Sequence, residues 1–222
     1  MFQSQSPRYQ APAFGATNVA TGALLGQVLG ITGVGFLITA IAAYLVRDVP
    51  YGVSLIAGLA GFVPLIAMNF TRANQPLSLA LFYVFAGIEG VAIGPIVANY
   101  ARVDGPATIV NAAATTGLGM LTLAAIVYLT SFDYRKLAGW AFAALVVLVI
   151  AGFVSIFWHF MSPTAYSWLT LIVFSVLVLV DFARIRAGGS GATAVQLATS
   201  IYLDAINIFL ALLRIFGGRG RD

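Results

Sequence analysis

Seven long runs of apolar residues follow one another along the chain, separated by short stretches that hold most of the charged residues. The runs cover residues 25–46, 52–71, 77–100, 107–129, 137–160, 164–181 and 194–217. Each has the roughly 20 residues that an α-helix needs to cross the hydrocarbon core of a bilayer. The pattern therefore predicts an all-α integral membrane protein with seven transmembrane helices, in which short connections make consecutive helices antiparallel neighbours.

The segments outside these runs are short, so we expect a single membrane domain. Residues 1–24 are predicted to form a polar tail, residues 25–217 the seven-helix domain, and residues 218–222 a short basic tail. The composition agrees, because 61% of the residues are hydrophobic and only 8% are charged, whereas soluble domains carry about 25% charged residues. The absence of cysteine excludes disulfides and zinc–thiolate sites.

The positive charges predict how the helices are oriented and argue against a nucleic-acid partner. The net charge of +4 lies at loops and ends, where it acts on topology and on anionic lipids. With the N-terminus in the cytoplasm, only Arg47 and Arg102 lie in outer loops. The inner segments then hold Arg8, Arg72, Arg135, Lys136, Arg184 and Arg186. The C-terminal arginines oppose this orientation, since seven spans place that end outside.

The last apolar run carries a polar stripe. Ser200, Asp204, Asn207 and Arg214 are spaced 4, 3 and 7 residues apart, so they share one face of a helix whose other faces are apolar. An ionisable side chain at mid-membrane costs on the order of a few kcal/mol. We therefore expect this helix at the centre of the bundle, with Asp204 facing inward.

Three further ionisable residues lie within or at the ends of predicted spans. Glu89 is the only glutamate of the chain and lies among glycines at positions 87, 90 and 94. It either belongs to an ion path or accompanies a small-residue face on which two helices pack. Asp181 lies at the end of the sixth run, and Arg72 closes the second.

The helix directions place these groups along one path. The second and sixth helices run the same way, so Arg72 and Asp181 share a membrane face, and Asp204 lies roughly 15 Å deeper. Two carboxylates close together in apolar surroundings do not both ionise readily, so such a pair can hold one proton and respond to pH. When deprotonated, the pair suits a hard cation such as calcium.

Arg72 adds a possible switch, if it pairs with Asp181 in one state and releases it in another. A plainer interpretation of each residue stays open. Asp181 could pair with Arg184 one turn further on, and Arg72 could serve only as a positive anchor at the membrane surface. Asp204 could be a structural group that Asn207 or another helix satisfies.

Three segments resemble the transmembrane Bax inhibitor motif family. IYLDAINIFLALLRIFG at 201–217 is similar to its closing helix, VLVDFARI at 178–185 to its sixth helix, and FAGIEGVAIGP at 85–95 to its third. The resemblance covers about residues 25–217. It implies that the last helix is surrounded by the other six. For bacterial members it implies a pH-sensitive calcium leak, with Asp181 and Asp204 as the sensor and an arginine at the position of Arg72 that pairs with Asp181 in the closed state.

The leading prediction is therefore a passive, pH-sensitive calcium leak in a bacterial inner membrane, surrounded by lipid, with no cofactor and no enzymatic activity. The alternative is a non-transporting regulator of stress response or protein quality control that binds other membrane proteins. An intramembrane aspartyl protease fits less well. Two membrane aspartates suit general acid–base chemistry, but Asp204 follows TyrLeu rather than the GlyxGly typical of such enzymes. The oligomeric state stays open.

Overall fold

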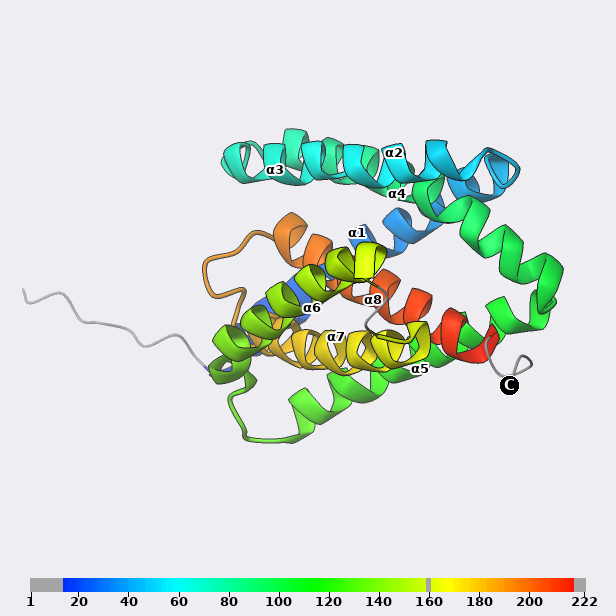
Figure 1. The fold of residues 1–222 in the computed structure, drawn as a ribbon. Helices are drawn as coiled ribbons and strands as arrows, with labels where there is room; N and C mark the ends of the chain where they lie inside the picture. The colour runs from blue at the N-terminus through cyan, green and yellow to red at the C-terminus, as the bar shows by residue number, and fades with distance from the viewer. Residues whose placement is uncertain (1–13, 159–160, 218–222) are drawn as a thin grey trace, which may run out of the picture.

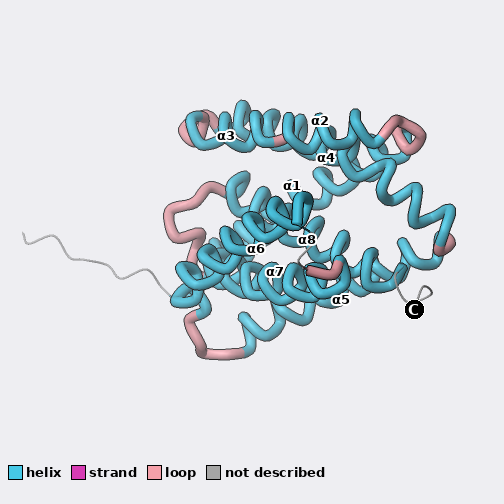
Figure 2. The backbone as a smooth tube through the Cα atoms, viewed as in Figure 1, coloured by secondary structure: helices cyan, strands magenta, loops and turns pink. Residues whose placement is uncertain are grey.

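The described residues are almost entirely helical. The computed structural model describes residues 14–158 and 161–217, and within these ranges it contains helices and short turns but no strand. Seven helical segments are long and apolar enough to cross a membrane (Figures 1 and 2). The prediction of an all-α membrane protein with seven spans is confirmed.

The helices follow the seven predicted runs closely. Their bounds are α1 Phe14–Leu45, α2 Tyr51–Ala60, α3 Phe62–Phe70, α4 Gln75–Val103, α5 Pro106–Leu129, the short 3-10 helix η1 Tyr134–Leu137, α6 Ala138–Trp158, α7 Pro163–Arg186 and α8 Ala194–Gly217. Together α2 and α3 form the second span, and η1 leads into the fifth. Helix α1 begins at Phe14, eleven residues before the expected start of the first span.

Turn chemistry sets several of these boundaries. Helices α4, α5 and α7 each have a proline in their first turn, where the missing N–H costs nothing. The side chain of Asn74 accepts a hydrogen bond from the N–H of Leu77, and that of Ser162 from the N–H of Ala165. These contacts satisfy N–H groups that have no partner inside the helix.

The second span differs from the single helix that the sequence predicts. It is interrupted at Gly61, between α2 and α3. Pro64 explains the position, because it cannot donate a hydrogen bond to the carbonyl of Ala60 and its ring crowds that carbonyl. Gly61 keeps a right-handed helical conformation, with φ −58° and ψ −25°. The chain therefore continues in roughly the same direction, and the two short helices serve as one span.

Helix α8 is the most buried of the seven spans, with 61% of its apolar stretch buried. It packs mainly against α1, α4, α5 and α7, whereas α2 and α3 pack on α4, and α6 packs on α7 and η1. In Figure 1, α8 runs through the middle of the bundle, behind α6. The stronger prediction, that all six other helices surround α8, is not confirmed.

Two of the three glycines near Glu89 allow α4 to lie directly against α1. A Cβ atom at Gly90 would come within 2.5 Å of the carbonyl oxygen of Thr39, and one at Gly94 within 2.7 Å of that of Ala43. At Gly87 the nearest atom would be 3.8 Å away, on Ile38. The predicted small-residue face therefore exists, and Gly90 and Gly94 form its closest contacts.

Candidate functional site

One cavity collects most of the predicted site residues. It has a volume of about 460 Å³ and lies among α2, α3, α4, α6, α7 and α8. Its polar lining consists of Glu89, Asp181, Arg184, Ser200, Asp204 and Asn207. Its other lining residues are glycine or apolar, including Phe62, Phe85, Phe142, Leu177 and Leu203. We call this space the carboxylate cavity.

Asp181 is paired within its own helix. Its side chain accepts a hydrogen bond from Arg184 at 3.1 Å and forms an ion pair with it, and the residue is only 4% exposed. Helix α7 runs on to Arg186, five residues beyond the predicted end of the sixth span. Asp181 therefore lies more than one helical turn inside the end of the helix, with Arg184 between it and the membrane surface.

Arg72 lies at the surface in the turn between α3 and α4, and its Nε donates to the carbonyl oxygen of Asn69 at 3.0 Å. The structure thus shows Arg184, the partner of the plainer interpretation, bound to Asp181. Pairing between Arg72 and Asp181 stays a prediction for another state.

Asp204 lies deeper, on α8, and is 5% exposed. Its Oδ2 atom is buried and has no hydrogen-bond partner in the described part of the chain. The amide of Asn207 donates to the carbonyl oxygen of Leu203 at 2.8 Å, one turn back along the same helix. Asn207 therefore does not satisfy this oxygen, and an unpaired carboxylate oxygen is left at the wall of the cavity. Such an atom is costly unless it binds a proton, water or a cation.

Arg214 is the one member of the predicted stripe that does not line the carboxylate cavity. It lies ten residues beyond Asp204, roughly 15 Å along the helix. The helical period correctly predicted that Ser200, Asp204 and Asn207 face one space, and the length of the cavity excludes Arg214.

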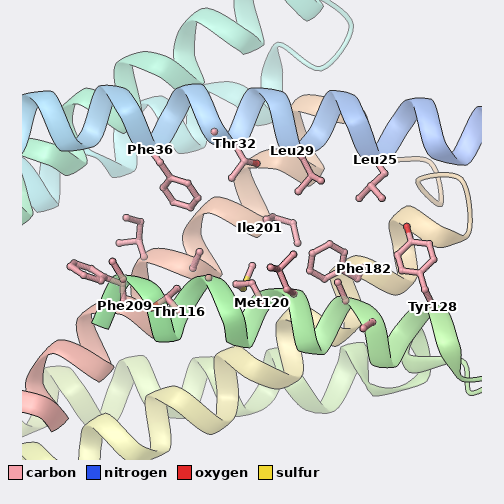
Figure 3. Close-up of a pocket in the computed structure, with 18 residues that line it drawn as sticks. Leu25, Leu29, Thr32, Phe36, Thr116, Met120, Tyr128, Phe182, Ile201 and Phe209 are labelled. Atoms are coloured by element: carbon pink, nitrogen blue, oxygen red, sulfur yellow. The ribbon is translucent and has the colours of Figure 1, made fainter. Parts of the chain in front are cut away.

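A larger cavity of about 620 Å³ between α1, α5 and α8 has a different character (Figure 3). Leu25, Leu29, Phe36, Met120 and Phe209 are among the side chains that point into it. Among the residues that the structure describes, no Asp, Glu, Lys, Arg or His lines it. It offers apolar contact but no charge for an ion, so the carboxylate cavity is the better candidate site.

The carboxylate cavity has few of the ligands that a resident metal ion needs. Among residues 14–158 and 161–217, no three His, Cys, Asp or Glu side chains come together to hold a metal. The polar side chains that could offer oxygen atoms are those of Glu89, Asp181, Ser200, Asp204 and Asn207, but the three carboxylates do not gather into one cluster, whereas calcium takes six to eight oxygen ligands. A calcium ion in this cavity would therefore keep part of its water shell.

Two structural contacts near the site were not predicted. The hydroxyl groups of Tyr202 and Thr39 are 2.6 Å apart, and Thr39 contacts the carbonyl oxygen of Ala86 at 2.9 Å. The Tyr202 ring packs against the rings of Phe82 and Phe85. These contacts tie α8 to α1 and α4 two residues before Asp204. The sequence offered one signal for these contacts, the hydroxyl group of Tyr202 within the last apolar run.

Arg186 makes the second set of contacts that the sequence did not predict. Its guanidinium donates to the carbonyl oxygens of Val127, Thr130 and Phe132 at the end of α5, the last two at 2.8 Å. These hydrogen bonds hold the C-terminal end of α5 against the C-terminal end of α7. The sequence indicated only a positive charge in a loop, because the partners are backbone atoms more than 50 residues away.

Comparisons with known proteins agree with this architecture. The family model described as "Inhibitor of apoptosis-promoting Bax1" matches residues 21–221. An uncharacterized membrane protein of Vibrio cholerae is 30% identical over 167 residues, which cover 74% of each chain. The protein of Escherichia coli K12 named "Modulator of FtsH protease YccA" is 29% identical over 169 residues, 76% of this chain and 77% of that protein.

An uncharacterized protein of Pseudomonas aeruginosa is 27% identical over 222 residues, 98% of this chain and 99% of its own length. The family match covers nearly all of the chain, and it includes every span and every residue of the carboxylate cavity. The protein therefore belongs to the family described as Inhibitor of apoptosis-promoting Bax1.

Proposed function

We propose that this protein is a passive, pH-sensitive pathway for cations, calcium above all, across a bacterial inner membrane. The observation that carries the proposal is the buried, unpaired Oδ2 atom of Asp204 at the wall of a cavity that also holds Asp181. An intramembrane carboxylate without a partner suggests an ion or proton path. Its burial destabilises the protein, and ionisable residues in such positions mark ion pathways and proton relays.

The pH dependence follows from the charges that face this cavity. They are the carboxylates of Glu89, Asp181 and Asp204 and the guanidinium of Arg184. Arg184 can neutralise one carboxylate, and it contacts Asp181. Each of the remaining carboxyl groups can bind either a proton or a cation, so the occupancy of the cavity depends on pH.

Flux from purified protein tests this proposal. Proteoliposomes that contain a calcium-sensitive dye are compared with empty liposomes from about pH 5 to pH 8, with sodium, potassium and a proton-sensitive dye as parallel assays. We expect calcium entry above the empty-liposome rate, with a rate that changes with pH. Calcium entry no faster than in empty liposomes at every pH would refute the proposal.

A second function is favoured by one relative. The Escherichia coli protein is named as a modulator of FtsH protease, so this chain could regulate a membrane-bound protease by binding it, without transport. Crosslinking in native membranes followed by purification would then yield a stable complex with such a protease. Protein that is silent in the flux assay but retains this complex would favour the regulator over the leak.

The proposed orientation places the N-terminus in the cytoplasm. The ends of α3, α5 and α7 then face the cytoplasm, with Arg72, Arg135, Lys136, Arg184 and Arg186. The excess of arginine and lysine over the opposite loops supports this choice. In Figure 1 these ends gather on the left, and the connections after α1 and α4 lie on the right.

A further inference from the structure

A second cavity continues from the first toward the opposite end of the bundle. It has a volume of about 570 Å³ and is lined by residues of α2, α4 and α8, among them Tyr51, Ser54, Ile96 and Leu210. Tyr51 is the first residue of α2, directly after the connection from α1. The cavity therefore reaches the membrane face opposite to Arg72 and Arg184. We call it the α2 cavity.

The two cavities meet at two residues. Gly58 and Glu89 line both the carboxylate cavity and the α2 cavity. On α8 the lining residues follow in order, from Ser200, Asp204 and Asn207 in the first cavity to Leu210 in the second. The junction therefore lies beside the part of α8 between Asn207 and Leu210. This part is between the buried aspartates and the membrane face at Tyr51.

Glu89 is the ionisable residue that lines both cavities. Its carboxylate accepts no hydrogen bond and forms no ion pair with any residue of the described ranges. Carboxylates inside a membrane span are costly unless paired or facing a polar space. Glu89 faces the carboxylate cavity, which supplies such a space, and it also lines the α2 cavity, where the other polar side chains are those of Tyr51 and Ser54.

Gly58 is the residue of α2 that lines both cavities. A Cβ atom at this position would approach only the Cβ of Ala92, at 3.8 Å, which is an ordinary contact. Alanine would therefore fit without displacing its neighbours. A leucine side chain adds three more carbon atoms beside the two cavities that Gly58 lines.

We infer that the path from Asp181 and Asp204 continues past Glu89 into the α2 cavity and leaves at the face of Tyr51. Glu89 is its third carboxylate, and Gly58 keeps the junction open. This inference rests on the proposed function as a cation pathway. It assigns the route to the side of α2 and α4, away from the apolar cavity between α1 and α5.

Flux through substituted protein tests the role of the junction. Glu89→Gln removes the ionisable group of the junction, and Gly58→Leu adds a bulky side chain there. Each is expected to lower calcium entry by on the order of tenfold, which corresponds to a barrier higher by about 1.4 kcal/mol. Gly58→Ala, the matched control, should retain the wild-type rate. Elution as a folded monodisperse species in detergent is required of each variant before its flux is compared.

Thiol labelling locates the route without relying on flux, because the chain has no cysteine of its own. A charged, membrane-impermeant thiol reagent is applied to proteoliposomes that carry Ile96→Cys or Leu210→Cys, both in the α2 cavity. Leu118→Cys on α5, where the native side chain is 66% exposed, is the lipid-facing control. We expect both cavity positions to react and the control to stay unlabelled.

The outcomes separate the two proposals. Calcium entry that depends on Asp204 but is unchanged by Glu89→Gln and Gly58→Leu would overturn the route and leave the cation pathway standing. Cavity cysteines that stay unlabelled while the wild type conducts would overturn the route as well. Wild-type protein without flux would overturn the cation pathway, and the route with it.

Discussion

Gly90 and Gly94 show how closely single residues determine this fold. A methyl group at either position would collide with backbone atoms of α1, so these glycines set the distance between α1 and α4. The same helix carries Glu89 into the junction of the two cavities. A small displacement of α4 would therefore move a charged residue of the proposed path.

Substitution of Gly90 tests this packing. Gly90→Ala should destabilise the protein by about 1–3 kcal/mol, as overpacked interiors do. Gly117→Ala is the matched control, because nothing lies within 4 Å of a Cβ atom there. Melting temperatures in detergent should fall for the first variant only. Equal melting temperatures for the two variants would contradict the close contact.

Asp133 offers a pH effect whose origin is outside the membrane. The Arg135 guanidinium beside it, which donates at 2.8 and 3.0 Å, holds the pKa of the Asp133 carboxyl below its usual value. The stabilising contact is thus fully present above the unfolded value of about 3.9 and is lost as the pH falls through the lower folded value.

Asp133→Asn should therefore lower the melting temperature by a constant amount above about pH 5, and the difference should shrink in more acidic buffer. Its calcium flux should keep the wild-type pH profile between about pH 5 and 8, since Asp133 stays ionised throughout. A shifted flux profile would place a pH sensor in this loop.

Residue types and spacing predicted part of the site. The helical period was enough to group Ser200, Asp204 and Asn207, because the backbone fixes the direction of side chains along one helix. The choice between Arg72 and Arg184 as the partner of Asp181 depends on where α7 ends and on side-chain conformation. The unpaired oxygen of Asp204 depends on every neighbouring helix, so the sequence could not show it.

At the scale of elements, the sequence predicted the seven spans. It did not predict the interruption at Gly61 or the contact of Arg186 with the end of α5. Hydropathy averages over about 20 residues and does not register a missing backbone hydrogen bond, although Pro64 was a local signal. Arg186 contacts backbone oxygens of Val127, Thr130 and Phe132. Carbonyl groups at a helix end look alike in every sequence, so this contact had no signature.

Removal of the Arg186 contacts should loosen the end of α5. Arg186→Gln should destabilise the protein by about 1–3 kcal/mol, because carbonyl groups lose charged donors. Lys136→Gln removes a positive charge from the same end of the bundle, where the Lys136 side chain makes no hydrogen bond within the described ranges. Hydrogen exchange should rise around residues 127–132 in the first variant alone. Unchanged exchange there would show that Arg186 does not hold α5.

At the scale of the whole molecule, the arrangement alternates the chain between two faces. Asp48, in the connection after α1, forms an ion pair with Arg102, in the last turn of α4. Arg135 donates to Ser190 at 3.5 Å and joins the connections after α5 and α7 at the other face. The connections after the first and third spans therefore lie on one side, and those after the fourth and sixth spans on the other, as seven crossings require.

Single cysteines test the proposed orientation. Ala73→Cys, at an exposed position in the turn before α4, should react with a membrane-impermeant thiol reagent only in inside-out vesicles. Val103→Cys, at the end of α4 where the native side chain is 54% exposed, should react only in right-side-out cells or spheroplasts. Labelling of both from one side would rule out a complete crossing by α4, and the reverse pattern would invert the orientation.

The central claim is that Asp204 lies on a cation path. The most direct measurement is the initial rate of calcium entry into proteoliposomes at about pH 6 and pH 8, with Asp204→Asn beside Asp48→Asn. Asp48 is a carboxylate of the same type but lies in the connection between α1 and α2, outside the cavity. The account predicts that Asp204→Asn alters the rate and its pH dependence, whereas Asp48→Asn leaves both unchanged. A folded Asp204→Asn variant with the wild-type rate at both pH values would contradict it.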